Sequence, residues 1–426
     1  MIVIALFLIF VLLILVEVPV AFAMILAVFA SMLAFTSTPV EIIVQRMPSG
    51  IDSFPLLAIP LFILAGNIMN GAGIANRIYD FSMAVVGHIR GGLAQVNILG
   101  SMVFAGMSGV AQADAAGLGT IEIKHMKERG YDPAFAAACT AASAIIGPII
   151  PPSVIMVVYA VTAEVSLTDL FLAGIVPGVL LGLTLMGLVY VQSVRGTITA
   201  PIEPRSSVPA LGTAFVRALP ALAAPTLLTV GLLSGVATPT ELGALTVVYA
   251  VFLGFLTRDL TLRSLLIHMR DSAITTGILT FIIAAAVPFG WLISVQNVSA
   301  ALQELMTWIN ADKYTFLLIA NAILLLAGLF METTAILLIA TPALLPVVKL
   351  YGIDPVHFGL IMILNLLIGS LTPPFGVILF ICKHIAGVTF KQMVRATIPF
   401  YVPLALMLLL ITYVPQISLW LPSMFK

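Results

Sequence analysis

The sequence predicts an all-α polytopic membrane protein built from inverted repeats, with two re-entrant helical hairpins and two broken helices. Three observations predict this fold class. Of the 426 residues, 61% are hydrophobic and only 8% are charged, whereas soluble domains carry about 25% charged residues. Two apolar stretches have lengths that fit no simple span, and a series of glycine, proline and aspartate residues is repeated 222 positions later.

The charge and cysteine content exclude several functions. Eighteen lysines and arginines offset eighteen aspartates and glutamates, so the chain has no basic excess for binding nucleic acid. Cys139 and Cys382 lie in apolar runs, which favours small hydrophobic filler over a disulfide or a metal pair. The motifs of zinc proteases, nucleotide-binding loops and serine hydrolases do not occur, so we do not expect an enzyme.

Apolar stretches long enough to cross a bilayer define the predicted spans. A spanning α-helix needs about 20 apolar residues, and glycine, proline and charged residues serve as boundaries. The predicted spans are residues 1–16, 18–36, 54–72, 133–163, 168–192, 218–236, 240–257, 272–295, 355–382 and 396–420. The first span lacks the positive region and cleavage site of a signal peptide, so we expect it to be retained.

Residues 91–122 and 314–350 do not fit this scheme. Each stretch is too long for one crossing and too short for two crossings with a turn, and each has small or polar residues near its middle. We therefore expect two re-entrant hairpins, each of which enters and leaves the membrane on the same side.

Positive side chains predict the orientation. Fourteen of the 18 lysines and arginines fall in five loops on one side of the membrane, at 73–90, 123–131, 193–217, 258–271 and 383–395. The other side has only Arg46, Lys313, Lys349 and Lys426. Because cytoplasmic loops carry an excess of these residues, we expect both termini to be periplasmic.

The 222-residue offset aligns residues that mark backbone events. It pairs Gly106 with Gly328, Pro133 with Pro355, and the two Pro-Pro pairs with each other. Two copies of one fold would keep such residues because glycine and proline mark where helices begin and break. Five predicted spans separate the loop at 123–131 from its counterpart, and this odd number makes the copies inverted, as in many secondary transporters.

Each repeat also contains a span that tandem prolines should break. The breaks fall at 147–153 and 369–376, where each Pro-Pro pair removes two backbone donors and leaves carbonyls free. Unwound backbone at membrane depth persists only where it lines a cavity or binds an ion. A packing kink is the alternative for one pair alone, but two pairs at matched positions favour an ion site.

The hairpin tips carry oxygen-bearing side chains of the kind that a hard cation such as sodium prefers. Those singled out are Ser108, Asp114, Glu332, Thr333 and Thr334. A carboxylate inside a membrane is costly unless it is paired or hydrated, so Asp114 and Glu332 are functional candidates. Helix capping is the alternative role for Asp114, and exposure at the tip is the alternative for Glu332. Asp132, Glu241 and Asp354 stand at helix starts and are expected to cap.

Three motifs resemble one transporter family. The hairpin GMSGVAQADAAGLGT, the break IIPPSVIMVVYA and the second break GSLTPPFGV resemble the large membrane subunit of tripartite ATP-independent periplasmic (TRAP) transporters, the DctM type. The likeness extends over essentially the whole chain, including the VEVPVAFAM link and the PLFILAGNIM run. In the first tip, family members often have a second serine where this chain has Val110, so a side-chain ligand is not expected there.

The resemblance implies a sodium-coupled importer of a small organic anion in the bacterial inner membrane, working as an elevator. It also implies two partners, a small membrane subunit encoded as a separate chain and a periplasmic substrate-binding protein. The first sodium ion would bind at Ser108, Gly147, Ile150 and Pro152, and the second at Gly328, Thr333, Gly369, Thr372 and Pro374. Asp114, Ser153, Glu332 and Thr334 would border the solute. A stand-alone sodium- or proton-coupled symporter of related fold is the alternative.

The same resemblance divides the chain into scaffold and transport regions. The expected parts are a scaffold at 1–90, a transport region at 91–163, connecting and scaffold helices at 164–313, a second transport region at 314–382 and a C-terminal helix at 383–426.

Overall fold

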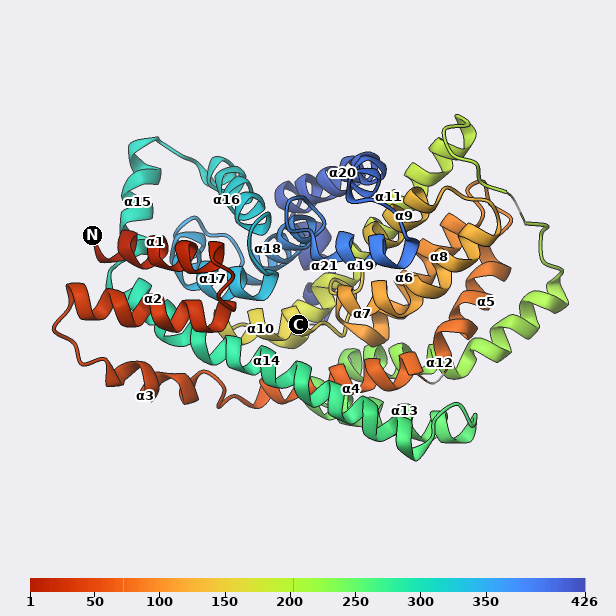
Figure 1. Ribbon diagram of the computed structural model, residues 1–426, viewed down its shortest axis with the longest axis horizontal. Coiled ribbons are helices and arrows are strands. Elements are labelled where there is room, and N and C mark those ends of the chain that lie inside the picture. Colours follow the sequence, from red (N-terminus) through yellow and green to blue (C-terminus); the bar gives the residue numbers. More distant parts are fainter. Residues whose placement is uncertain (72, 202, 426) are drawn as a thin grey trace.

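The computed structural model describes residues 1–71, 73–201 and 203–425, and these ranges are helical without any strand (Figure 1). The first half of the chain contains α1 (Ile2–Leu15), α2 (Val20–Phe35), α3 (Glu41–Ser49), the short 3-10 helix η1 (Phe54–Leu57), α4 (Ala58–Gly71), α5 (Ile74–Val86), α6 (Leu93–Ser108), α7 (Ala111–Ala116), α8 (Leu118–Glu128), α9 (Pro133–Ala144), α10 (Val154–Ala163) and α11 (Leu167–Val194). The second half contains α12 (Val208–Ser234), α13 (Pro239–Leu256), α14 (Leu262–Val295), α15 (Val298–Trp308), α16 (Lys313–Gly328), α17 (Thr333–Leu350), α18 (Pro355–Ser370), α19 (Val377–Ala386), α20 (Phe390–Tyr413) and α21 (Gln416–Met424).

The 222-residue repeat is confirmed at the level of helices. Pro133 begins α9, and the residue 222 positions later, Pro355, begins α18. The same offset relates α2 to α13, α5 to α15, α6 to α16, α10 to α19 and α11 to α20. It also carries the pair α7 and α8, residues 111–128, onto the single helix α17, residues 333–350. The repeat therefore extends well beyond the glycine and proline positions that revealed it.

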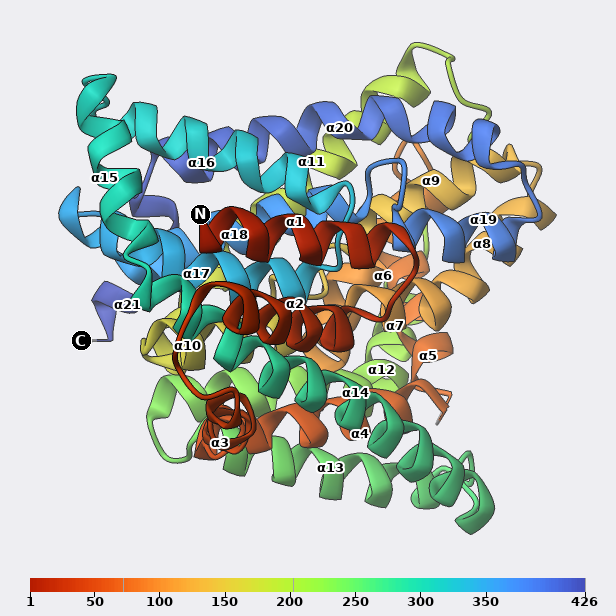
Figure 2. The ribbon, with the colours of Figure 1, turned by 60° about the vertical axis from the view of Figure 1, so that its left-hand side comes forward.

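Helices of each repeat pack against helices of the other repeat. Helix α10 of the first repeat packs against α17 of the second, and α19 of the second packs against α7 and α8 of the first. In the same way α20 packs against α9, and α11 against α18 (Figure 2). Such reciprocal contacts are those of two copies related by a two-fold axis.

Both stretches predicted as re-entrant fold as helical hairpins. In hairpin 1, α6 packs against α7 and α8 after a turn at Gly109, whose φ of +62° suits glycine. In hairpin 2, α16 packs against α17. The predicted end of hairpin 1 at residue 122 is wrong, because α8 continues to Glu128. Residues 123–128 are good helix formers with cations in the last turn, which stabilises the end of a helix.

Both predicted breaks form as well. Helices α9 and α10 are separated by residues 145–153, and α18 and α19 by residues 371–376. Both Pro-Pro bonds, Pro151-Pro152 and Pro373-Pro374, are cis. The second break begins later than expected, since Gly369 and Ser370 still belong to α18.

Several predicted span boundaries need correction. Among the described residues, seven helices are long and apolar enough to cross a membrane, and α1 and α2 fall short of this length with 14 and 16 residues. The span predicted at 272–295 begins ten residues earlier at Leu262, where Thr261 caps it. The last predicted span, 396–420, is in fact α20 from Phe390 to Tyr413, because Pro415 follows that helix and cannot continue it. Two segments expected as loops contain the short helices α3 and α15.

The predicted helix caps are confirmed. The Asp132 carboxylate accepts a hydrogen bond from the backbone N–H of Ala134 at 3.3 Å, and the Asp354 carboxylate accepts one from Val356 at 2.7 Å. Glu241 forms a capping box with Thr238. These three acids thus satisfy helix starts, as their positions indicated.

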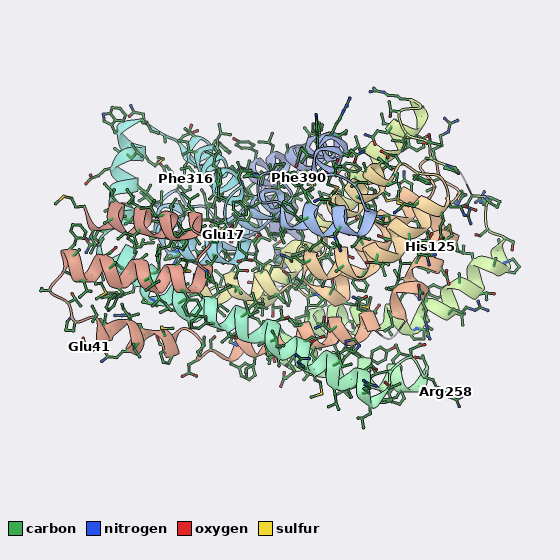
Figure 3. The ribbon with its side chains drawn as sticks, in the orientation of Figure 1. Glu17, Glu41, His125, Arg258, Phe316 and Phe390 are labelled. Carbon is green, nitrogen blue, oxygen red and sulfur yellow. The ribbon has the colours of Figure 1, made fainter. Side chains whose placement is uncertain are left out.

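Figure 3 places His125 and Arg258 toward one end of the long axis, Glu41 toward the other end and Glu17 between them. Both Cys139 and Cys382 are buried and unpaired. Ser108 in the first tip and Gly147 in the first break are buried, whereas Phe330 in the second tip and Phe375 in the second break are exposed.

Candidate functional site

A cavity of about 270 Å³ lies where the two hairpin tips meet. Its lining comes from both repeats and from α14, and comprises Gly109, Val110, Ala111, Gln112, Pro148, Val154, Ile155, Thr275, Leu279, Glu332, Thr333, Thr334, Leu367 and Ser370. Small-molecule sites have volumes of about 300–1,000 Å³ and mostly apolar walls with a few polar groups. The cavity is at the lower limit of that range and suits a small solute.

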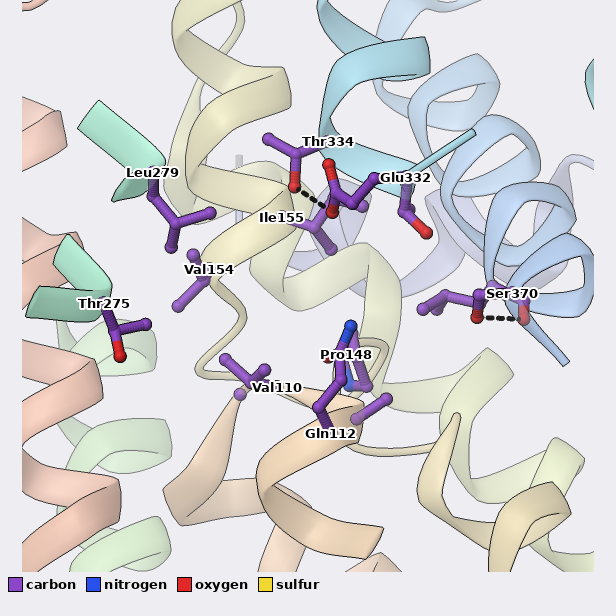
Figure 4. A pocket seen from close by; sticks show the side chains of 14 residues that line it. Val110, Gln112, Pro148, Val154, Ile155, Thr275, Leu279, Glu332, Thr334 and Ser370 are labelled. Atoms are coloured by element: carbon purple, nitrogen blue, oxygen red, sulfur yellow. Dashed lines mark hydrogen bonds between the residues drawn. The ribbon is translucent and has the colours of Figure 1, made fainter. Parts of the chain in front are cut away.

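The charged group on the cavity wall is Glu332. Its carboxylate accepts hydrogen bonds from the Thr334 hydroxyl at 2.9 Å and from the Ala335 backbone N–H at 3.0 Å (Figure 4). Glu332 is thereby the N-cap of α17 as well as a cavity residue. The two predicted cavity residues Glu332 and Thr334 lie together in the structure.

None of the 14 lining residues is a lysine or arginine. Two helices begin at the cavity instead, because Val154 opens α10 and Thr333 opens α17. The N-terminus of an α-helix carries a partial positive charge and free backbone N–H groups. The start of α10 is the feature of the wall that favours an anion, because the Glu332 carboxylate already caps the start of α17.

The predicted first ion site is assembled around the tip of hairpin 1. A methyl group on Gly147 would lie 3.7 Å from the Ser108 hydroxyl oxygen, and one on Gly109 would lie 2.6 Å from the Pro152 carbonyl oxygen. The Gly109 carbonyl accepts a hydrogen bond from Val154 at 3.3 Å. The tip therefore rests directly against the first break, and Ser108, Gly147 and Pro152 come together.

Oxygen atoms at this place lack hydrogen-bond donors. The Ser108 hydroxyl is 2% exposed and has no partner among the described residues. Within the same part of the chain, the carbonyl oxygens of Gly147, Ile150 and Pro152 accept no hydrogen bond. Ile150 packs its side chain against Gly178, so only its carbonyl is available as a ligand. Buried oxygens are normally satisfied, so a cluster of oxygens without donors is unusual.

Val110 adds a detail to this tip. Its side chain faces the cavity (Figure 4), whereas its carbonyl carbon lies 3.9 Å from the methyl position of Gly147. A backbone contribution toward Ser108 is thus compatible with valine, and a serine at this position would present its hydroxyl to the cavity.

The predicted second ion site is more tightly packed. Gly328 and Gly369 meet backbone to backbone, since a methyl group on Gly369 would lie 2.7 Å from the Gly328 α-carbon. The carbonyls of Gly369 and Thr372 each accept a turn hydrogen bond, at 2.8 and 3.2 Å. The Thr372 hydroxyl donates to the Ile368 carbonyl at 2.7 Å. Among the described residues, the carbonyls of Gly328 and Pro374 accept none.

Other candidates lie in different places. Thr333 lines the cavity, but Asp114 and Ser153 are not among its lining residues. Ser153 is buried, donates to the Pro148 carbonyl at 2.6 Å and caps α10. Asp114 is buried inside hairpin 1. Ser153 therefore shapes the break, and Asp114 lies outside the lining of this cavity.

Sequence reasoning missed four polar residues. Gln112, Thr275 and Ser370 line the cavity, and Glu122 is buried beside Asp114. Gln112 and Ser370 stood within the recognised motifs but had no assigned role. Thr275 has no signal in the sequence, because α14 reaches the cavity only through tertiary packing. Glu122 is followed closely by cations in the chain, so the sequence alone gives no sign that it is buried.

A family model described as "Tripartite ATP-independent periplasmic transporter, DctM component" matches residues 7–417. The chain belongs to this family. As a TRAP large permease it is a transporter subunit and not an enzyme, and its apolar helices make it a multi-pass protein of the inner membrane.

Known relatives align with nearly the whole length of this TRAP permease. The sialic acid TRAP transporter large permease protein SiaM of Vibrio cholerae is 40% identical over 96% of this chain and 95% of its own length. The C4-dicarboxylate TRAP transporter large permease protein DctM of Pseudomonas aeruginosa is 38% identical over 92% of each chain. The crystal structure of the Alcanivorax borkumensis YdaH transporter, 15% identical, superposes with a TM-score of 0.61 over 91% of this chain and 90% of its own, which shows a shared fold.

Proposed function

We propose that this TRAP permease imports a small organic anion together with sodium ions by an elevator movement. The observation that carries the proposal is the junction of tip 1 with the first break, where Ser108 and three carbonyls present unpartnered oxygens next to the cavity. Oxygen-only sites with backbone carbonyls suit a hard, weakly charged cation. A cation there would also offset the negative charge of a solute in a cavity that lacks lysine and arginine.

The substrate class follows from the cavity and the relatives. Sialic acid and C4-dicarboxylates, named for the relatives, are carboxylates. The helix start at Val154 would receive such a carboxylate, while the polar side chains of Gln112 and Ser370 would bind hydroxyl or carbonyl groups. We therefore place C4-dicarboxylates, 2-oxo acids and sialic acids among the candidates.

The proposed movement uses the connection between hairpins and broken helices. Asn97 of hairpin 1 binds Thr140 and Ser143 of α9 at 2.7 Å each, and Asn365 of α18 donates to Asn321 of hairpin 2 at 2.8 Å. Buried polar bonds of this kind resist separation. Each hairpin would thus travel with its broken helix, and the re-entrant hairpins would enter from opposite sides.

Two partners complete the proposed transporter. The family to which the chain belongs is tripartite, and we assign the other parts to a small membrane subunit and a periplasmic substrate-binding protein. The binding protein would deliver the solute to the periplasmic side, where we place both termini.

A reconstituted vesicle assay tests the proposal. The purified permease is placed in liposomes with the small subunit, and the binding protein is added outside with a radiolabelled candidate anion. We expect uptake only with an inward sodium gradient and all three components, and loss of uptake when an ionophore collapses the gradient. Uptake that is independent of sodium would refute the coupling, and uptake by this chain alone would indicate a stand-alone symporter.

A further inference from the structure

Hairpin 1 encloses two carboxyl groups that the proposed ion and solute sites do not use. Asp114 of α7 and Glu122 of α8 are each 1% exposed. Among the described residues, no group hydrogen-bonds to any of their four carboxyl oxygens. Neither residue lines the cavity between the tips. Such a pair requires an explanation, because an unpaired buried carboxylate is among the most costly groups in a protein.

The two carboxyl groups face consecutive residues of the opposite arm. A methyl group on Gly100 of α6 would lie 2.7 Å from the Oε1 atom of Glu122, so the carboxyl group occupies the space that this glycine leaves open. Asp114 lies beside Ser101, whose hydroxyl hydrogen-bonds to that of Ser143 at 3.1 Å. Asp114 and Glu122 are within electrostatic range of each other.

A third polar group points to the same place. The hydroxyl oxygen of Ser82 in α5 is fully buried, has no hydrogen-bond partner among the described residues, and lies 3.9 Å from the same methyl position on Gly100. Ser82 and Glu122 therefore meet at Gly100 from two different helices. An unpartnered hydroxyl at this point can accept a hydrogen bond from a carboxylic acid.

Among the described residues, no positive side chain compensates the pair. The titratable groups that face it from the surrounding helices α5, α9 and α19 are Tyr79, Cys139 and Cys382, which are neutral when protonated. The nearby cations are bound elsewhere: Lys124 pairs with Glu128, Lys127 donates to the Ala386 carbonyl, Arg129 pairs with Glu203, and the His125 ring packs on Tyr79.

A proton fits this environment better than a metal ion. Two like charges in a low-dielectric interior repel each other, and a buried carboxyl group avoids the cost by taking up a proton. No group of three or more histidine, cysteine, aspartate or glutamate side chains that could hold a metal occurs in the described part of the chain. A proton needs no coordination shell, only an acceptor such as Ser82.

We propose that Asp114 and Glu122 form a proton-binding site inside hairpin 1. Each carboxylate takes one proton from water and is held as a neutral acid while the hairpin is packed as in this structure. The site is separate from the proposed sodium sites and does not depend on sodium coupling. It gives the permease a bound proton load that responds to the packing of hairpin 1.

Infrared difference spectroscopy on the purified permease tests the proposal. A protonated carboxylic acid has a C=O stretch that carboxylates lack and that shifts in heavy water. We expect this band at neutral pH in the wild type, and the loss of one component in Asp114→Asn and in Glu122→Gln. Glu128→Gln, a change at an exposed carboxylate of the same hairpin, is the matched control and should keep the whole band. If neither variant loses any part of the band, both groups are ionised in the wild type and the proposal is overturned.

The wild type alone provides a second test that does not depend on folding of the variants. Alkaline titration should remove the acid band reversibly, and saturating sodium or calcium chloride at neutral pH should leave it in place. If either metal abolishes the band and releases protons in unbuffered solution, the pair is a metal site and the proton assignment fails.

Because asparagine and glutamine imitate the neutral acids, we also expect Asp114→Asn and Glu122→Gln to retain the thermal stability of the wild type.

Discussion

At the scale of single residues, the surroundings of Ser108 distinguish a sodium ligand from an ordinary buried serine. Its hydroxyl is buried without a partner and faces Gly147, a glycine whose own carbonyl is free. Leaving a buried hydroxyl unsatisfied costs about 1–3 kcal/mol. A bound cation would offset this cost. If Ser108 bound no cation, removal of its hydroxyl would stabilise the folded protein.

We predict that Ser108→Ala raises the sodium concentration needed for half-maximal uptake by about tenfold, with little loss of folded protein. The reason is that a ligand to a charged group contributes about 1.5–3 kcal/mol, and each 1.4 kcal/mol is about a factor of ten in affinity. Sodium titration of uptake in reconstituted vesicles measures the effect.

Ser31→Ala is the matched control for this experiment. Ser31 of α2 is also a fully buried hydroxyl without a partner among the described residues, but it does not line the cavity. Its substitution should leave the sodium dependence unchanged. An equal shift in both variants, or none in Ser108→Ala, would remove Ser108 from the ion site.

At the scale of elements, the hairpins and breaks were accessible from the sequence because their causes are local. Tandem prolines cannot continue a helix wherever they are placed, and both breaks occur at them. Hairpin lengths follow from apolar run lengths. Helix ends without such a marker were wrong by several residues, as at Glu128 and Leu262, because packing and capping decide them.

Only some of the residues that line the cavity could be predicted from the sequence. Glu332 and Thr334 were predicted because a polar tip in an apolar hairpin is conspicuous. Thr275 and Glu122 were missed because their burial depends on helices far away in the sequence. The motif predicts Gly369 in the break, whereas the structure places it in α18, in contact with Gly328 of α16.

This contact between α16 and α18 leads to a prediction at the same scale. In Gly369→Ala, the added methyl group would lie 2.7 Å from the α-carbon and 3.0 Å from the carbonyl carbon of Gly328, which are backbone atoms and cannot rotate away. Overpacking of this kind typically costs about 1–3 kcal/mol. We expect Gly369→Ala to unfold at a lower temperature than the wild type.

Gly187→Ala is its control. A methyl group on Gly187 of α11 meets nothing within 4 Å. An alanine in a helix is more favourable than a glycine by about 1 kcal/mol, so this variant should be as stable as the wild type or more so. Thermal unfolding of the two variants in the same detergent gives the comparison, and equal effects would show that the Gly328–Gly369 approach is not required.

At the scale of the whole molecule, the two-fold packing of the repeats and the uneven distribution of charge must be consistent with the same membrane topology. The reciprocal packing of α10 on α17 and of α19 on α7 and α8 shows two related copies, but it does not orient them in a membrane. The distribution of lysine and arginine predicts an orientation, since 14 of 18 fall in five segments that the predicted topology puts on the cytoplasmic side. An inverted repeat requires that loops matched by the 222-residue offset face opposite sides.

Labelling with a membrane-impermeant maleimide tests this sidedness. We expect Ser37→Cys, between α2 and α3, to be labelled in intact spheroplasts, and Thr199→Cys, between α11 and α12, only after the membrane is opened. Both positions are exposed, and the native Cys139 and Cys382 are fully buried, so the wild type provides an unlabelled background. The charge excess places Thr199 beside Arg195 and Arg205 in the cytoplasm, where the reagent cannot reach it. The reverse pattern would invert the topology, and labelling of both cysteines from outside would contradict the odd number of predicted spans between them, which are 54–72, 133–163 and 168–192.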